Sequence, residues 1–322
     1  PITTSFDGAI NQLDKDLERH IKEYLAVRCG MQEIFSYPWM EESYVNAILQ
    51  STDGILALST PPSPSERFIR ASLLPNLCRA VAKNERYYGD FAIFETAQVF
   101  RDENYTAPYD EREKLPSQRK NVAGAFVSAG KDVTGLFRRA KGVVEMMPRY
   151  THMEPYSFRQ VSKPVWADEV VWLNIYLGEE YIGDLALLSK RVSMACGIKN
   201  VNVMLFQLDQ DALIPLRSRT NSFRHLAEYP MTDYDISLLL DGQVKWADVA
   251  QTIGGIKNPL LHGAAFVDEY RGKQVPEGKK SLTARLTIGS AEKTLTSAEI
   301  EEVANSVLKK LAKRFGAELR SR

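Results

Sequence analysis

Residues 268–282 contain the segment that decides how the last third of this chain folds. Residues 268–272 read Asp-Glu-Tyr-Arg-Gly, and residues 275–282 read Val-Pro-Glu-Gly-Lys-Lys-Ser-Leu. Two strand-like stretches therefore stand on either side of a turn that carries proline and glycine. We expect a hairpin whose strands cover residues 265–270 and 281–288.

The segments around this hairpin complete a regular pattern. Thr296 and Glu299 have the spacing of a capping box, which predicts a helix running to about Arg314. The other expected elements are a strand over 235–240, a turn at 241–242, a helix over 246–253 that two glycines end, and a strand over 317–320. The order is βαββαβ, which predicts a ferredoxin-like domain, and the open sheet face of such domains binds RNA in several families.

Charge is unevenly placed along the helix predicted after Thr296. Acidic residues fill its first turn and basic residues its end, as the helix dipole favours. They are Glu299, Glu301 and Glu302, followed by Lys309, Lys310, Lys313 and Arg314.

The first two thirds of the chain mix helices and strands in irregular order. Apolar residues recur every four positions from Leu13 to Leu25 and predict a helix over 11–28. We also expect strands over 33–37, 91–95, 122–127, 171–176 and 203–208, helices over 73–84, 133–145 and 189–196, and a long exposed loop over 102–120. This order favours an α+β fold with a mainly antiparallel sheet. Residues 216–228 are polar and basic, so we expect a linker there between domains over 1–215 and 229–322.

Composition excludes several classes of protein. The 322 residues are 44% hydrophobic and 25% charged, as in soluble globular proteins. Basic and acidic residues both number 41, so net charge does not indicate a nucleic-acid partner, although a local patch can still bind phosphate. The three cysteines are expected to be free thiols, and the four isolated histidines argue against a metal site. Without a membrane-spanning run, a signal peptide or an initial Met, we expect a cytoplasmic fragment or trimmed chain.

The predicted hairpin has one face suited to a nucleic-acid base. By the two-residue period, Asp268 and Tyr270 share a face, and Ser281 and Arg285 lie on the open face of the next strand. A tyrosine ring can stack on a base, and Asp268 can accept hydrogen bonds from a guanine edge, with Ser281 reaching a third group. The alternative is an ordinary solvated sheet face.

Basic residues gather in the same hairpin. From 271 to 285 they are Arg271, Lys273, Lys279, Lys280 and Arg285, against Glu277 alone, which gives 5 − 1 = +4. Such a cluster beside a stacking face favours phosphate contact, although charged hairpins also occur without a function.

Residues 229–320 resemble the ferredoxin-fold anticodon-binding domain of phenylalanyl-tRNA synthetase β chains. The resemblance rests on the hairpin quoted above, on Thr-Leu-Thr at 294–296 and on Arg-Phe-Gly-Ala-Glu-Leu-Arg at 314–320. One departure is Tyr234 before Asp235, where the family has Arg-Asp. The upstream region resembles the catalytic-like module of the same subunit at 69–77, 94–100, 181–185 and 205–209.

The resemblance implies a class II synthetase-like antiparallel sheet module followed by the ferredoxin-like domain. It implies a non-catalytic part of phenylalanine–tRNA ligase that binds the tRNA anticodon region and assembles with a catalytic α subunit, as an (αβ)2 heterotetramer that uses ATP and Mg. By resemblance, Asp268, Tyr270 and Ser281 match positions that contact the anticodon, and Arg271, Lys279, Lys280 and Arg285 complete the expected tRNA-binding set. The helix over 11–28 either packs on the core or joins the bundle between the subunits.

No catalytic residue is expected in this chain. Arg101 follows a strand as an active-site arginine would, but the Phe-His-Gln segment of the active subunit does not follow it. No glycine-rich strand with an arginine follows Leu208, so Arg101 is interpreted as a solvated residue. The rival hypotheses are a free-standing paralogue that binds RNA or protein as a regulatory module, and an autonomous ATP-using enzyme, which the missing motif disfavours.

Overall fold

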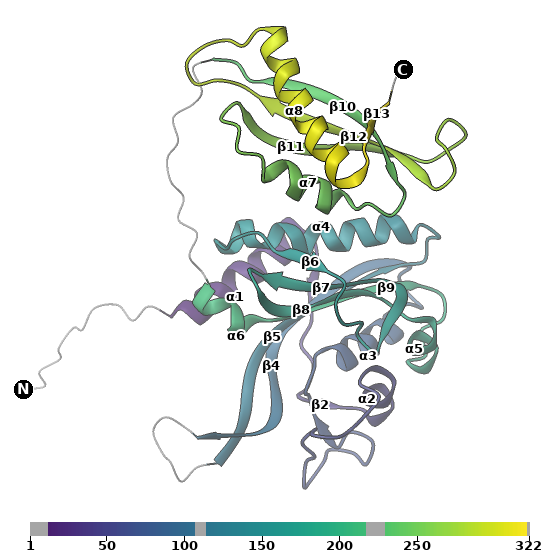
Figure 1. The fold of residues 1–322 in the computed structure, drawn as a ribbon. Coiled ribbons are helices and arrows are strands. Elements are labelled where there is room, and N and C mark those ends of the chain that lie inside the picture. The colour runs from purple at the N-terminus through teal and green to yellow at the C-terminus, as the bar shows by residue number, and fades with distance from the viewer. Residues whose placement is uncertain (1–11, 107–113, 217–228, 321–322) are drawn as a thin grey trace, which may run out of the picture. The chain divides into compact units, whose positions relative to one another are not determined.

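The computed structural model describes residues 12–106, 114–216 and 229–320, and the chain separates into two compact units, residues 1–221 and 222–322 (Figure 1). The linker predicted over 216–228 lies outside the described residues from 217 onward. The N-terminal unit has two large hydrophobic cores, and the C-terminal unit has one.

A seven-stranded sheet is the centre of the N-terminal unit. Neighbouring strands run antiparallel except β1 and β4, which are parallel, so the predicted α+β fold with a mainly antiparallel sheet is confirmed. In sheet order the strands are β1 (Gln32–Glu33), β4 (Asp90–Thr106), β5 (Lys114–Ser128), β9 (Asn202–Asp209), β8 (Glu180–Leu188), β7 (Ala167–Leu177) and β6 (Ser157–Arg159).

Helices cover both faces of this sheet, on opposite sides in Figure 1. On one face pack α1 (Leu13–Glu23), its π-helical continuation η1 (Tyr24–Arg28) and α4 (Val133–Thr151). On the other pack α2 (Glu42–Ile48), α3 (Leu74–Asn84) and α5 (Lys190–Ala195). Because both faces are buried, the middle strands are apolar at successive positions rather than at alternate ones.

Strand β5 shows what burial on both faces requires. Val122 and Phe126 pack into one core, whereas Ala123 and Ala125 pack into the other. Gly124 lies against the ring of Phe206, and a Cβ at this position would collide with the ring carbons. Glycine is therefore needed at 124, since interiors packed at crystal-like density have no room to shift an aromatic ring.

The prediction of an exposed loop over 102–120 is wrong for most of that range. Strand β4 continues to Thr106 and β5 begins at Lys114, and their backbones pair as far as Thr106 with Lys114. A register shift between Arg101 and Asn104 interrupts the pairing. Polar residues and Pro116 hid these strands, because backbone pairing in a hairpin needs no alternation of apolar side chains.

Shorter elements complete the N-terminal unit. The ribbon of β2 (Trp39–Met40) and β3 (Phe68–Ile69) is a separate two-stranded sheet, and α6 (Gln210–Leu213) and the 3-10 turn η2 (Ile214–Leu216) follow β9. The sequence predicted neither α2 nor strand β8.

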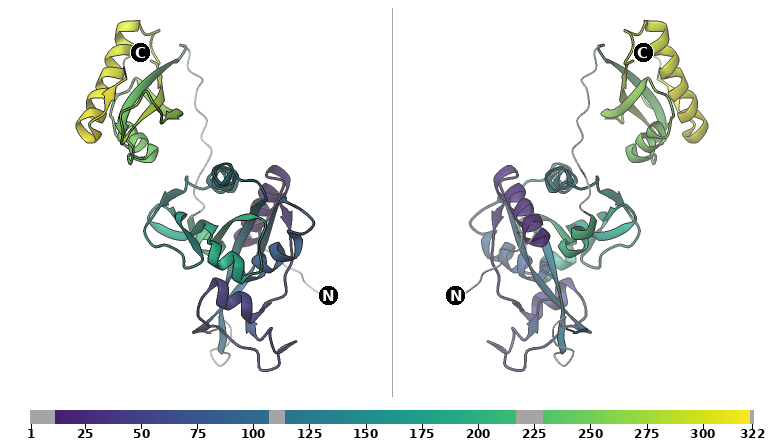
Figure 2. Two further views of the ribbon diagram at one scale, coloured as in Figure 1. Left: turned by 90° about the vertical axis from the view of Figure 1, so that its right-hand side faces the viewer. Right: turned by 90° about the vertical axis from the view of Figure 1, so that its left-hand side faces the viewer.

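The C-terminal unit has the predicted βαββαβ order. Its elements are β10 (Thr232–Asp241), α7 (Trp246–Gly254), β11 (Leu261–Tyr270), β12 (Lys279–Ile288), α8 (Ser297–Phe315) and β13 (Glu318–Leu319). The strands pair antiparallel in the order β11-β12-β10-β13, which confirms the ferredoxin-like arrangement. Both helices pack on one face of the sheet and leave the other face open (Figure 2).

Local signals fix the ends of α8. The Thr296 hydroxyl accepts from the Glu299 amide, and the Glu299 carboxylate accepts from the Thr296 amide at 2.8 Å, which is the predicted capping box. Hydrogen bonds from Lys293 and Thr296 lower the pKa of Glu299 to about 2. At the other end, Gly316 is left-handed with φ 62°, a conformation that glycine adopts without strain.

The described helices include none that is long and apolar enough to cross a membrane. In residues 12–106, 114–216 and 229–320, no three acidic, histidine or cysteine side chains gather as a metal site would require. Cys29, Cys78 and Cys196 are free thiols, as predicted.

Candidate nucleic-acid interface

Three cross-strand rows of the open face of the C-terminal sheet carry the candidate residues or lie beside them. Residues directly opposite in register project from the same face. Because Leu282 and Ala284, next to them on β12, are buried against the helices, these rows lie on the face away from the helices. The rows are Tyr270–Ser281–Leu239, Asp268–Thr283–Ser237 and Ala265–Arg285–Asp235.

Tyr270 is the exposed aromatic side chain of this face. It is 40% exposed, and the guanidinium of Arg320 lies 5.6 Å from its ring centroid. Tyr270 comes from the edge strand β11 and Arg320 follows the opposite edge strand β13, so the two side chains meet over the middle strands. A base can stack on the free side of the ring or replace Arg320. The sequence did not indicate this contact, since it depends on how far two long side chains reach across a sheet.

Ser281 lies directly opposite Tyr270 but is only 3% exposed. The prediction placed it on the right face but did not foresee that it would be covered. Its hydroxyl becomes available to a ligand only if the side chains above it move apart.

Lys280, one of the basic residues counted in the hairpin, lies on the other side of the sheet from Tyr270. It projects toward the helix-covered face and is 4% exposed, and its Nζ lies 2.8 Å from Glu269 Oε2. Arg271 donates to the other oxygen of Glu269 at 2.8 Å and to the Gly242 carbonyl at 2.9 Å. Burial raises the pKa of Glu269, but the hydrogen bonds from Lys280 and Arg271 outweigh it and leave this pKa below its ordinary value. Lys280 therefore stabilises the hairpin instead of facing solvent.

Arg285 is exposed on the open face but is paired. Its guanidinium donates to both carboxylate oxygens of Asp235, at 2.7 and 2.8 Å. These hydrogen bonds lower the pKa of Asp235 and raise that of Arg285. Lys279 similarly lies 3.6 Å from Glu318. The +4 count within the hairpin is therefore largely neutralised by acidic residues, most of them from the neighbouring strands.

The open face is better suited to recognition by shape and hydrogen bonding than to general phosphate attraction. Asp268, exposed beside Tyr270, offers an acceptor for the edge of a stacked base. In the same row, the hydroxyls of Ser237 and Thr283 lie 3.0 Å apart and bond to each other. The face can thus hold a base by stacking and specify it through a carboxylate.

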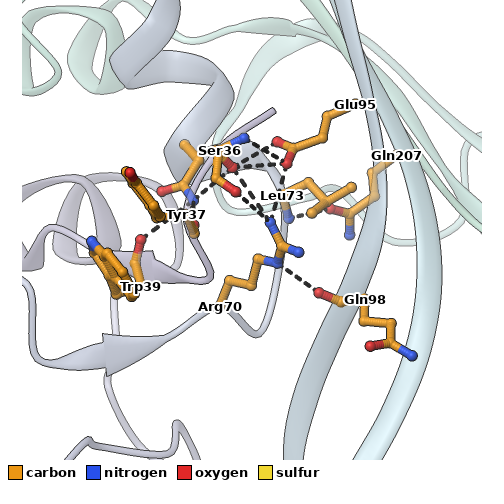
Figure 3. A network of polar contacts seen from close by, with 9 residues as sticks. Ser36, Tyr37, Trp39, Arg70, Leu73, Glu95, Gln98 and Gln207 are labelled. Atoms are coloured by element: carbon orange, nitrogen blue, oxygen red, sulfur yellow. Dashed lines mark hydrogen bonds and ion pairs between the residues drawn. The ribbon is translucent and has the colours of Figure 1, made fainter. Parts of the chain in front are cut away.

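A buried polar network lies in the N-terminal unit (Figure 3). Arg70 donates to Glu95 at 3.1 Å and to the Gln98 carbonyl at 2.6 Å, and Ser36 donates to Glu95 through its amide and its hydroxyl. Asn76 donates to the hydroxyl of Ser36. Glu95 is 2% exposed, so this charge pair fastens the segment after β1 to β4 instead of meeting a substrate.

Arg101 was considered above as a possible active-site arginine. It lies on β4 and borders a pocket of about 710 Å³ in the same unit. Arg119, the second arginine there, lies 3.1 Å from Asp209. The carboxylates in the lining outnumber these two arginines and are Glu180, Asp184, Asp209 and Asp211. A triphosphate needs compensating positive charge, which this lining does not supply.

Comparison with known proteins adds independent findings. Residues 227–320 match the ferredoxin-fold anticodon binding domain family, and residues 3–210 match the phenylalanyl tRNA synthetase beta chain CLM domain family. The chain is 27% identical to the phenylalanine–tRNA ligase beta subunit of Oceanobacillus iheyensis over 326 residues, covering 95% of this chain and 38% of that protein. It is 28% identical to the same subunit of Carboxydothermus hydrogenoformans, covering 99% and 40%. The chain thus spans about two fifths of the length of these relatives.

Solved structures show a likeness of fold. Two structures of the pyrrolysyl-tRNA synthetase of Desulfitobacterium hafniense superpose with TM-scores of 0.50 and 0.51 at 14% identity. Each superposition covers 63% of this chain. It covers 68% of the synthetase chain in the first structure and 69% in the second. At this identity the likeness concerns the fold alone, and the predicted synthetase-like fold is confirmed.

Proposed function

Because the chain belongs to the phenylalanyl-tRNA synthetase β-chain family, we propose that it is a non-catalytic, tRNA-binding part of phenylalanine–tRNA ligase. The observation that carries the proposal is the open sheet face of the ferredoxin-fold unit, where exposed Tyr270 lies beside Asp268. A ring next to a carboxylate acceptor on an uncovered sheet is an arrangement that holds and reads a single-stranded base.

The proposed site keeps most of the predicted residues and changes the role of one. Asp268, Tyr270 and Ser281 would contact the anticodon, and Arg271, Lys279 and Arg285 would lie along the adjoining backbone. Lys280 would act indirectly, by holding Glu269 and the hairpin in place. We propose the division of the chain into residues 1–215 and 229–322, joined by 216–228.

The proposed partners follow from the family. The chain would assemble with the catalytic α subunit in the cytoplasm, within an (αβ)2 heterotetramer whose α subunits use ATP and Mg. The N-terminal unit would contribute a synthetase fold without synthetase chemistry, in keeping with the acidic lining of the pocket beside Arg101. A free-standing paralogue would not bind the α subunit, so co-purification of the two chains separates the alternatives.

The RNA-binding proposal is tested at Tyr270. Replacing it with alanine removes the stacking ring, and a base stacked on an aromatic side chain contributes about 1–3 kcal/mol, so the Kd for phenylalanine tRNA should rise about 5- to 150-fold. Y270F should bind nearly as the wild type does. Y87A, at a 66% exposed tyrosine of the N-terminal unit, is the matched control and should change nothing. Equal affinity of Y270A and wild type would remove Tyr270 from the site.

A further inference from the structure

A basic groove on the helix-covered side of the C-terminal unit has no part in the proposed function. It lies between α7 and α8 and has a volume of about 810 Å³. On the α8 side its wall is made by Ser306, Lys309, Lys310, Lys313 and Arg314. Steps of three and four residues bring these side chains to one side of the helix, next to the apolar stripe that packs on the sheet. The lining contains these four cations and no acidic residue.

The positive charge of this groove is not compensated by ion pairs. Lys309, Lys310 and Lys313 are exposed, and within residues 229–320 none of the observed ion pairs includes them. This differs from the open sheet face, where Arg285 and Lys279 both meet carboxylates. Unpaired cations lining a concave surface concentrate the positive field there.

Arg314 is held in position in the wall of the groove. Its Nη1 donates to the hydroxyl of Thr252 at 3.0 Å, and that hydroxyl donates to the Asp248 carbonyl at 2.7 Å. Thr252 is 4% exposed, so the guanidinium is anchored to a buried group of α7. An anchored guanidinium loses less side-chain entropy on binding an anion than a free one does.

The helix dipole alone does not account for this arrangement. A dipole favours cations anywhere around the last turns of a helix. On α8, however, the cations gather on the side that faces α7, whereas Asn305 and Ala312, exposed in the same part of the helix, are uncharged. The gathering on one side indicates a ligand, and the absence of acidic residues from the lining indicates an anionic one.

We infer that this groove binds the phosphate backbone of RNA. Lys309 and Lys313 are about 6 Å apart along the helix axis, which spans about two phosphates of a nucleic-acid strand. Lysine contacts to phosphates carry no information about the base sequence, so such a groove would bind RNA of any sequence. The inference rests on the proposed tRNA-binding function. Because the groove lies on the helix-covered side of the sheet and Tyr270 on the open side, the bound phosphates belong to nucleotides other than the one stacked on Tyr270.

The test compares the groove with the sheet face in the full chain. The triple variant K309Q/K310Q/K313Q leaves the anchored Arg314 intact. Its Kd for a phenylalanine tRNA transcript should rise about tenfold at 100 mM salt, and the slope of log K against log salt should decrease in magnitude by about 2–3. Y270A should weaken binding without changing that slope. The control K131Q/K190Q/K199Q removes three exposed lysines of the N-terminal unit and should keep the wild-type slope.

The outcomes separate this inference from the proposed function. If Y270A binds weakly while the triple variant keeps the wild-type Kd and slope, the groove inference is overturned and the proposed function stands. If the wild type does not bind tRNA, the proposed function fails, and the groove inference fails with it. A second measurement on the wild type does not depend on how the variants fold: bound tRNA should protect Lys309, Lys310 and Lys313 from acetylation but not Lys131, Lys190 and Lys199. Equal acetylation of both sets at saturating tRNA would overturn the inference.

Discussion

Both faces of the C-terminal unit carry basic residues. On the open sheet face they are paired with carboxylates, whereas in the groove between the helices they are not. On the open sheet face, Arg285 pairs with Asp235 and Lys279 lies near Glu318. In the same hairpin, Lys280 points to the helix-covered side and is paired with Glu269. In the groove between α7 and α8, four cations line the surface without an acidic neighbour in the lining. A count of basic residues along a segment therefore does not give the field of the folded surface, because acidic residues from neighbouring strands can cancel it.

The difference indicates that base specificity and phosphate attraction belong to different surfaces of this unit. A sheet face whose charges are paired adds little unspecific phosphate attraction. In the proposed site, stacking on Tyr270 and hydrogen bonding to Asp268 would then determine which base is bound. An unpaired basic groove acts in the opposite way, since it increases affinity for any RNA backbone and makes that affinity depend on salt. Specificity and attraction would then be located on separate surfaces of one small domain.

The largest expected effect comes from removing the central acid of the hairpin. E269Q leaves Lys280, whose side chain is 5% exposed, without its carboxylate. Breaking a buried ion pair from one side leaves an uncompensated charge, so we expect a loss of about 2–3 kcal/mol in the free energy of unfolding. Urea denaturation of the full chain measures it, and E277Q, at an exposed loop residue, is the control that should stay within about 0.5 kcal/mol. Equal stability of the two variants would show that Lys280 does not need Glu269.

Acid should remove the difference between wild type and E269Q. In the folded chain the pKa of Glu269 lies below its ordinary value, although burial alone would raise it. A carboxylate with a depressed folded pKa contributes stability that is complete above its unfolded pKa of about 4.3 and is lost as pH falls through the folded value. The two chains should therefore differ equally at pH 7 and pH 5 and converge below about pH 4. Convergence already between pH 7 and pH 6 would contradict this assignment.

Sequence reasoning placed these residues on faces but could not pair them. That Asp268 and Tyr270 share a face follows from the local two-residue period, and the core positions Leu282 to Ile288 follow in the same way. The partner of Lys280 depends on a register shift between Phe266 and Asp268, which turns Glu269 to the same face as Lys280. Such a bulge has no sequence signal here, so a local charge count could not show that Lys280 is paired and buried.

In the N-terminal unit, sequence patterns predicted some whole helices and strands and missed others. Strongly periodic or apolar segments such as α1, α3 and residues 122–127 of β5 were predicted, because their burial imposes a pattern. The hairpin of β4 and β5 beyond Arg101 was missed, because backbone pairing maintains it without such a pattern. The buried pair of Arg70 and Glu95 joins segments that only the fold brings together.

Removing the carboxylate partner of Arg285 would leave an unpaired cation on the sheet face, as in the groove. D235N removes the carboxylate that holds Arg285 and leaves an unpaired guanidinium on the open face. tRNA affinity at low salt should then increase about two- to threefold, and the salt slope should grow by up to about 0.9, as one added phosphate contact predicts. D233N is the matched control, since Asp233 on the same strand accepts from the hydroxyl of Thr287 instead of a cation. It should increase affinity less than D235N, and equal effects would mean that charge removal alone, not a freed arginine, is responsible.

The smallest expected effect is on stability at the groove itself. Lys313 lies in the last turn of α8, where a cation interacts favourably with the helix dipole, so K313Q should cost about 0.3–0.5 kcal/mol of unfolding free energy. The same substitution should reduce the salt slope of tRNA binding by about 0.9, because one phosphate contact is lost. The stability loss and the change in salt slope together show whether Lys313 serves mainly to bind RNA or mainly to stabilise α8. Urea denaturation and binding titrations on the same preparation measure both, and the exposed K131Q provides the baseline. A stability loss above about 1 kcal/mol with an unchanged slope would make Lys313 a structural residue, and the contrast between the two faces would then lose its functional meaning.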